Sequence, residues 1–331
     1  MESKLYTLSE TATFINKGYL LSLAGDESIL AQLPKGSWIG GTIPYFMNSE
    51  KPSFSNDKVY VNKLSDSIID FNIKVYNDSS IYNIVEDSFS NGFTILILPP
   101  FQAVQRVYAL ESPNIKGIYN NPIIGWISGK GIGSSTIPKV LNGQNMQVYE
   151  DKAVAMHVKL PVNKTAELDV INVYEEDLSK PTITFLNSGV DIHDCMINEK
   201  KENLYNYIRK NNIDVRLPLM SNHNGVIVNV SIQEVDKDFN IISFYAPVFN
   251  DREYFFSKQV DEKDSDLNFN TKKINSHTEL SFLCVLNYIY LELVNNTIHK
   301  IKGPFTFGEI GYHLLNQTIV SLKILDKKSD E

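Results

Sequence analysis

Residues 92–99 read Gly-Phe-Thr-Ile-Leu-Ile-Leu-Pro, a nearly uninterrupted apolar run between a glycine and a proline. Such a run is typical of a central strand that is covered on both faces. Before it, residues 79–89 carry apolar side chains at helical spacing, and after it residues 101–110 read as another helix. A further apolar run at 122–127 predicts the next strand. The pattern therefore indicates strands that alternate with helices.

The same alternation extends towards the N-terminus. Thr7 and Glu10 form a capping-box pattern that predicts a helix up to Lys17. A second helix is expected from Asp26 to Leu33, where Pro34 and Gly36 follow. Strands are expected at 19–24, 37–45, 58–64, 71–76, 147–149 and 153–160.

The second half begins after a polar stretch, residues 161–181, which reads as a junction between lobes. Asp236–Asn240 has the composition of a hairpin turn between strands 225–235 and 241–249. Residues 261–278 are polar and are expected to form a mobile loop. The other expected elements are a helix at 198–211, strands at 254–260 and 279–285, a helix from there through Lys300, and strands at 305–310 and 317–325.

Together these elements predict a mixed α/β (α+β) protein of two pseudo-symmetric lobes, each a mixed β-sheet with flanking helices. A Gly/Thr strand followed by an apolar strand occurs at 40–64 and again at 303–325, which suggests the pseudo-symmetry. The expected boundaries are an extension at 1–35, lobes at 36–178 and 179–325, and a charged tail at 326–331.

Composition excludes some classes of function. The 331 residues include 43% hydrophobic ones and carry a net charge of −8, which disfavours binding to nucleic-acid phosphates. Two cysteines are too few for a disulfide framework. No secretory signal and no apolar run of about 20 residues is visible, so neither export nor a membrane span is expected. We predict a cytoplasmic protein; the oligomeric state stays open.

Familiar catalytic and metal-binding motifs are incomplete. Gly129–Ser134 contains three glycines and Lys130, but Gly131 stands where a P-loop needs Ser or Thr, so a flexible loop is favoured. Asp191–Cys195 lacks further ligands at zinc spacing, and its Asp and His suit helix capping. No metal, cofactor or catalytic residue is therefore predicted.

One segment combines an acid with aromatic rings. If residues 305–310 are extended, Phe305, Phe307 and Glu309 lie on one face. A carboxylate beside two rings is a receptor for an ammonium or guanidinium group. Gly308 would allow a ligand to approach the backbone closely. The alternative is that Glu309 bonds to loop amides and holds the turn at Gly311.

Residues 303–311, Gly-Pro-Phe-Thr-Phe-Gly-Glu-Ile-Gly, followed by Leu-Asn-Gln-Thr at 315–318, resemble the closing motif of the FIST (F-box and intracellular signal transduction) sensory-domain family. Leu280–Cys284 is similar to the family's strand that ends in a cysteine, although the Gly-Arg pair expected next is missing. Gly40–Tyr45 and the strand with Trp126 look more weakly like the N-terminal FIST domain. The chain reads as a divergent bacterial member.

This resemblance implies a non-catalytic sensory protein. It would bind a small molecule, such as an amino acid or another amine, between its lobes and signal through a separate protein. The expected ligand-binding residues are Phe305, Thr306, Phe307, Gly308, Glu309, Cys284, Gly40, Gly41, Thr42, Tyr45 and Trp126. Three alternatives stay open: a hydrolase or transferase that uses Cys284 or Glu309, an interaction module without a ligand, and a haem-based sensor.

Overall fold

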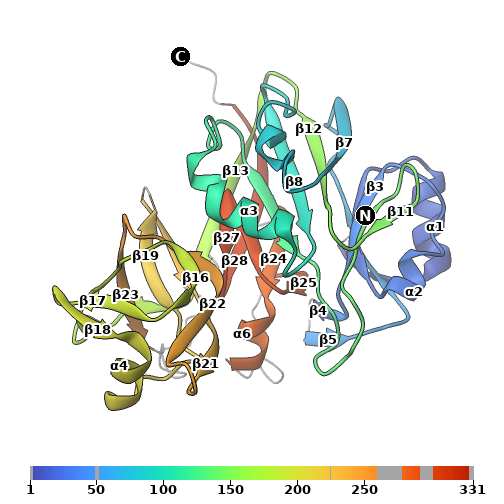
Figure 1. Ribbon diagram of the computed structural model, residues 1–331. Helices are drawn as coiled ribbons and strands as arrows, with labels where there is room; N and C mark the ends of the chain where they lie inside the picture. Colours follow the sequence, from blue (N-terminus) through green and yellow to red (C-terminus); the bar gives the residue numbers. More distant parts are fainter. Residues whose placement is uncertain (1–2, 49–51, 224, 259–277, 291–300, 328–331) are drawn as a thin grey trace. The chain divides into compact units, whose positions relative to one another are not determined.

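The structure is a computed structural model that describes residues 1–331 apart from 1–2, 49–51, 224, 259–277, 291–300 and 328–331 (Figure 1). The chain forms two compact units. Unit 1 comprises Met1–Asp169, Thr271–Leu314 and Ile319–Glu331, and unit 2 comprises Val170–Asn270 and Leu315–Thr318. Most of unit 2 is therefore a single insertion into the sequence of unit 1.

In its described residues, unit 1 is built on three six-stranded sheets. The first has the order β1 (Lys4–Tyr6), β6 (Val59–Lys63), β2 (Leu21–Gly25), β3 (Trp38–Thr42), β10 (Val140–Asn142), β11 (Gln147–Tyr149). The second has the order β7 (Asp70–Tyr76), β12 (Ala153–Lys159), β8 (Gly92–Leu98), β9 (Ile123–Ile127), β26 (Glu309–Gly311), β27 (His313–Leu315). The third has the order β13 (Lys164–Asn172), β28 (Thr318–Asp326), β24 (Thr278–Cys284), β25 (Gly303–Thr306), β4 (Tyr45–Met47), β5 (Pro52–Phe54).

The three sheets share one connectivity. Each has a central parallel pair, β2–β3, β8–β9 or β24–β25, and the first strand of that pair also bonds to an antiparallel neighbour, β6, β12 or β28. The connection within each pair includes a helix: α2 (Glu27–Leu30), α3 (Ala103–Glu111) or α6 (Val285–Tyr290). Unit 1 thus consists of three structural repeats.

The repeats exchange strands in a cycle. The first sheet receives β10 and β11 from the second repeat, the second receives β26 and β27 from the third, and the third receives β4 and β5 from the first. The received strand pairs antiparallel with the outer strand of each parallel pair, as in Val140↔Gly41, Glu309↔Trp126 and Gly303↔Met47. The sheets of unit 1 therefore have a pseudo-threefold arrangement.

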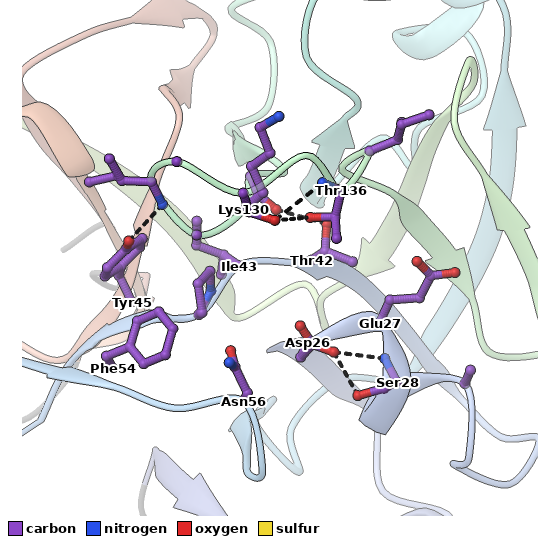
Figure 2. A pocket seen from close by; sticks show the side chains of 18 residues that line it. Asp26, Glu27, Ser28, Thr42, Ile43, Tyr45, Phe54, Asn56, Lys130 and Thr136 are labelled. Carbon is purple, nitrogen blue, oxygen red and sulfur yellow. Dashed lines mark hydrogen bonds between the residues drawn. The ribbon is translucent and has the colours of Figure 1, made fainter.

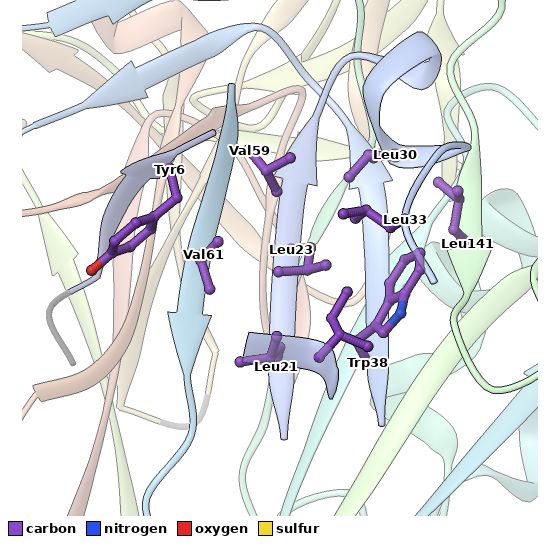
Figure 3. Packing of buried hydrophobic residues seen from close by; sticks show 10 residues of the cluster. Tyr6, Leu21, Leu23, Leu30, Leu33, Trp38, Val59, Val61 and Leu141 are labelled. Atoms are coloured by element: carbon purple, nitrogen blue, oxygen red, sulfur yellow. The ribbon is translucent and has the colours of Figure 1, made fainter. Parts of the chain in front are cut away.

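Buried apolar faces hold these sheets together. All seven residues of β8 are buried, as the apolar run at 92–99 predicts. Side chains of the first sheet pack with those of α1 (Leu8–Asn16) and α2, and Figure 3 shows Leu21, Leu23 and Trp38 in this core. Both halves of the Thr7–Glu10 capping box are present at the start of α1, which confirms that prediction. The complete core cluster of buried residues is Tyr6, Ile15, Leu21, Leu23, Leu30, Leu33, Trp38, Val59, Val61 and Leu141.

Unit 2 is mainly β-structure. One sheet has the order β18 (Lys200–Asn203), β17 (Asp194–Ile197), β15 (Ile183–Phe185), β23 (Glu253–Lys258), β19 (Leu219–His223), β20 (Val226–Val230), and β14 (Glu175–Glu176) pairs with β23. A second sheet has the order β16 (Gly189–Ile192), β22 (Ile241–Val248), β21 (Ile232–Asp236). The helix α4 (Leu204–Lys210) begins at Asn203, whose side chain caps it. The turn between β21 and β22 lies where Asp236–Asn240 predicts it.

The predicted fold is confirmed as mixed α/β with several sheets, whereas the pair of pseudo-symmetric lobes is not confirmed. The structure groups the chain differently from the predicted boundaries. Residues 1–35 supply β1 and β2 to the first sheet, and β24 to β28 close the third repeat of unit 1, so neither forms a separate domain. The change from unit 1 to unit 2 between Asp169 and Val170 does fall within the polar stretch 161–181 that the sequence predicts as a junction, and it lies inside the long strand β13.

Some local predictions are wrong. The helix expected at 79–89 is only the 3₁₀ turn Ile81–Ile84 followed by turns. The side chain of Asn77 accepts hydrogen bonds from the backbone and hydroxyl of Ser80, and such local bonds compete with a regular helix. The helix expected at 198–211 begins later because β18 occupies its start. The 3₁₀ turn Ser112–Asn114 follows α3. The loop predicted at 261–278 and the helix end predicted at Lys300 lie outside the described residues, except for Thr278, which begins β24.

Candidate functional site

A pocket of about 770 Å³ opens within unit 1, at the carboxyl end of β3. Three segments of the first repeat form one side: the start of α2, the link between β3 and β4, and the β5 strand with the turn that follows it. The loop at residues 128–139, which joins β9 to β10, forms the other side (Figure 2). The lining residues are Asp26, Glu27, Ser28, Ala31, Thr42, Ile43, Pro44, Tyr45, Phe54, Asn56, Gly129, Lys130, Gly131, Ile132, Gly133, Ser134, Thr136 and Ile137.

The 128–139 loop is where the second repeat departs from the other two. The corresponding link consists of Ile43 and Pro44 in the first repeat and of Phe307 and Gly308 in the third. The backbone here is closely packed: a Cβ built on Gly129 would lie 2.4 Å from the ring of Phe307 and 2.6 Å from Ile43. The pocket therefore lies beside the 128–139 loop, which is much longer than the corresponding links of the first and third repeats.

Asp26 supplies a carboxylate to the pocket. One of its oxygens, Oδ1, accepts hydrogen bonds from the Ser28 backbone N–H (2.9 Å) and hydroxyl (2.6 Å) and so caps α2. Within the described chain no hydrogen bond or ion pair engages the second oxygen, Oδ2. Asp26 is partly exposed, so a solute in the pocket can reach its charge.

Glu27, the other acid of the lining, is already paired. Lys139 Nζ lies 2.7 Å from Glu27 and 3.2 Å from Glu150. The hydrogen bond from Lys139 to Glu27 raises the pKa of Lys139, so the ammonium stays charged. Asp26 is therefore the carboxylate that a ligand cation can engage without breaking an ion pair.

Two aromatic rings lie on the same side of the pocket as Asp26. Tyr45 and Phe54 pack edge to face, with ring centroids 5.3 Å apart. Tyr45 is nearly buried, while Phe54 is 54% exposed. In Figure 2 both rings lie across the pocket from the 128–139 loop, and the Lys130 ammonium extends away from Asp26. The carboxylate of Asp26, the amide of Asn56 and the rings of Tyr45 and Phe54 thus line a solvent-accessible pocket.

Residues 6–325 match a family of unknown function, DUF6976. The chain belongs to DUF6976. No curated protein matches its sequence. Nothing in the DUF6976 match links the chain to the FIST family, so that resemblance stays a prediction.

In this DUF6976 member, only two of the residues predicted to bind a ligand line the pocket: Thr42 and Tyr45. Gly40 and Gly41 lie buried in β3, and a Cβ built on Gly41 would lie 2.7 Å from the Trp126 ring. Trp126 is itself completely buried. Gly41 and Trp126 pack the first and second sheets against one another, whereas Gly40 lies against Leu23 and Trp38 of its own sheet; none of the three lines the pocket.

The predicted acid-and-aromatic face is wrong in its geometry. Phe305, Thr306 and Glu309 have no exposed surface, and neither does Cys284. The single strand expected at 305–310 is broken, because β25 ends at Thr306 in one sheet and β26 begins at Glu309 in another. Phe307 N–H donates to Ile127 O, and Ile127 N–H donates to Gly308 O, which carries the chain from β25 to its place beside β9. Thr306 Oγ1 lies 3.4 Å from Glu309 Oε1.

The sequence indicates few of the pocket residues. Asp26 has only the signature of a helix start, and Phe54 and Asn56 carry no local signal. The Gly129–Ser134 loop is rich in glycine but does not match the P-loop pattern. Its position in the pocket depends on β10 joining the first sheet, a contact between distant residues that no local pattern reveals.

Two features are absent from the described residues. No group of three or more His, Cys, Asp and Glu side chains is placed to hold a metal ion. No helix in that part of the chain combines the length and apolar character needed to cross a membrane.

Proposed function

We propose that this protein is a non-catalytic sensor that binds a small amine or amino acid in the unit 1 pocket and signals through a separate protein. The observation that carries the proposal is the unpaired oxygen of Asp26 in a pocket that also contains the rings of Tyr45 and Phe54. An ammonium group gains from a nearby carboxylate and from the faces of aromatic rings. The sequence predicts that Glu309 is the carboxylate that binds the ammonium group; we propose Asp26 in its place.

The size of the pocket supports a small-molecule ligand. Pockets that hold such ligands commonly measure about 300–1,000 Å³ and combine apolar walls with a few polar groups. The volume of about 770 Å³ and the mixed lining agree with this description. Cys284 and Glu309, on which the hydrolase or transferase alternative depends, lie outside this pocket and are buried.

The substitution Asp26→Asn tests the proposal. Asparagine caps helices about as well as aspartate, so the change removes the charge and keeps the bonds to Ser28. We expect binding of the ammonium ligand to weaken tenfold or more, because a partly desolvated charge pair is lost. The measurement is calorimetry with amines and amino acids preselected by thermal-shift screening and by native mass spectrometry of the freshly purified protein.

The matched control is Asp57→Asn, an exposed acid in the turn after β5 that does not line the pocket. It changes the net charge equally and should leave the affinity within about twofold, since an exposed charge outside the pocket is screened. Equal weakening by both substitutions, or undiminished binding after Asp26→Asn, would reject the role of Asp26. A panel in which no amine or amino acid binds would reject the ligand class.

A further inference from the structure

The 128–139 loop is fastened firmly at its base. Gly129 N–H donates to Thr42 O (2.6 Å), and Thr42 N–H donates to Lys139 O (2.9 Å). The Thr42 hydroxyl donates to Gly129 O (2.9 Å) and accepts from Lys139 N–H (2.9 Å). Both ends of the loop are therefore joined to one buried residue, and a movement of the loop would leave its base in place.

The tip is held much more weakly. Ile132 N–H donates to the Tyr45 hydroxyl at 2.8 Å. The other hydrogen bonds found for residues 130–138 stay within the loop, between Gly131 and Ser134 and between Ser134 and Thr136. Ile132 is 61% exposed and Ile137 is 54% exposed. In the described structure, one hydrogen bond thus joins the tip to the opposite wall of the pocket.

The glycines give the tip freedom to move. A Cβ built on Gly133 would meet no atom within 4 Å, and the φ of +80° at this residue favours glycine. At Gly131 the nearest atoms would lie 3.8 and 3.9 Å away, one of them in the exposed ring of Phe54. Open space and few buried contacts are the properties of segments that open locally at low cost in free energy.

We infer that the 128–139 loop is a lid over the pocket and that the Tyr45 hydroxyl is its latch. The inference rests on the proposed function for what the lid covers. Tyr45 belongs to the pocket lining as well as to the latch. A ligand ammonium that donates to the Tyr45 hydroxyl oxygen competes with Ile132 N–H for this acceptor and frees the tip, so occupancy of the pocket changes the exposed surface that a partner meets.

The substitution Tyr45→Phe tests the latch without any ligand. It keeps the ring that packs on Phe54 and removes only the hydroxyl. Between 128 and 138 the only Lys or Arg is Lys130, so trypsin reports on the tip through cleavage after this residue. Because a hydrogen bond of this kind shifts an opening equilibrium about 3- to 10-fold, cleavage after Lys130 should accelerate by that factor.

The control is Tyr82→Phe, which removes an exposed hydroxyl for which the described structure shows no partner. Its cleavage rate after Lys130 should equal that of the wild type. Hydrogen exchange at the Ile132 amide should accelerate in Tyr45→Phe by the same factor as cleavage. An unchanged cleavage rate, or a faster rate accompanied by a lower urea midpoint of unit 1, would overturn the latch. These measurements use no ligand. Their outcome for the latch is therefore independent of whether an amine or amino acid binds in the pocket.

Discussion

Gly125→Ala is expected to destabilise unit 1 by about 3 kcal/mol or more. Gly125 lies in β9, the strand shared between β8 and the received strand β26. A Cβ at this position would lie 1.8 Å from Leu96 O and 2.8 Å from Leu96 C, both backbone atoms of β8. The clash cannot be relieved by a side-chain rotation, so the parallel pair itself would have to separate.

Tryptophan fluorescence during urea unfolding measures this effect in unit 1 alone. The chain has two tryptophans, Trp38 and Trp126, and both are buried in unit 1. The control is Gly131→Ala, whose Cβ would meet atoms no closer than 3.8 Å; its free energy of unfolding should stay within about 0.5 kcal/mol of the wild type. If Gly125→Ala unfolds at the wild-type urea concentration, the close packing of β8 on β9 is not a source of stability.

Glu279→Gln is expected to stabilise unit 1 at pH 8 and to have little effect at pH 4. Burial raises the pKa of Glu279 in β24 to about 7, against the opposing influence of the Ser65 backbone hydrogen bond and the Lys63 charge. Among the residues that the structure describes, none forms a hydrogen bond with one carboxylate oxygen of Glu279, Oε1. Between pH 4.5 and 7 the unfolded chain therefore releases a proton that the folded chain keeps, and stability falls as the pH rises.

Above pH 7 this penalty reaches its limit of about 3 kcal/mol, since each pKa unit corresponds to about 1.4 kcal/mol. Glutamine carries no charge and retains an oxygen for the Ser65 bond, so the variant should gain about 1–3 kcal/mol at pH 8. The free energies of unfolding of the wild type and the variant are compared by urea unfolding at pH 4, 6 and 8, monitored by tryptophan fluorescence. A gain of the same size at every pH would show that the charge of Glu279 is not the cause.

Local patterns predicted the parts of this fold that depend on neighbouring residues. The apolar run at 93–98, the capping box at Thr7 and the turn at Asp236–Asn240 each carry their own physical reason, and each is present in the structure. The threefold repeat could not be found in this way. Its helices α2 and α3 differ in length, and the 128–139 loop and unit 2 interrupt two of the repeats.

The candidate site shows the same limit. The sequence suggests that an acid is paired with aromatic rings, and alternation along a strand assigns this pairing to Phe305, Phe307 and Glu309. Alternation holds only within one continuous strand, whereas the chain changes sheets at Phe307. Asp26, Tyr45 and the 128–139 loop come together only through the pairing of β10 with β3.

The cyclic exchange of strands has a consequence for how the chain is made. β4, at residues 45–47, pairs with β25, at 303–306, and unit 2 is synthesised in the interval. At a synthesis rate of about 5–20 residues per second, the nascent β4–β5 hairpin waits roughly 10–50 s for its partner. A polypeptide truncated before residue 303 would lack β25, so the backbone N–H and C=O groups on that edge of β4 would be unpaired. Such an edge promotes aggregation. The ribosome must therefore have synthesised the chain through residue 306 before the exchange of strands among the three sheets is complete.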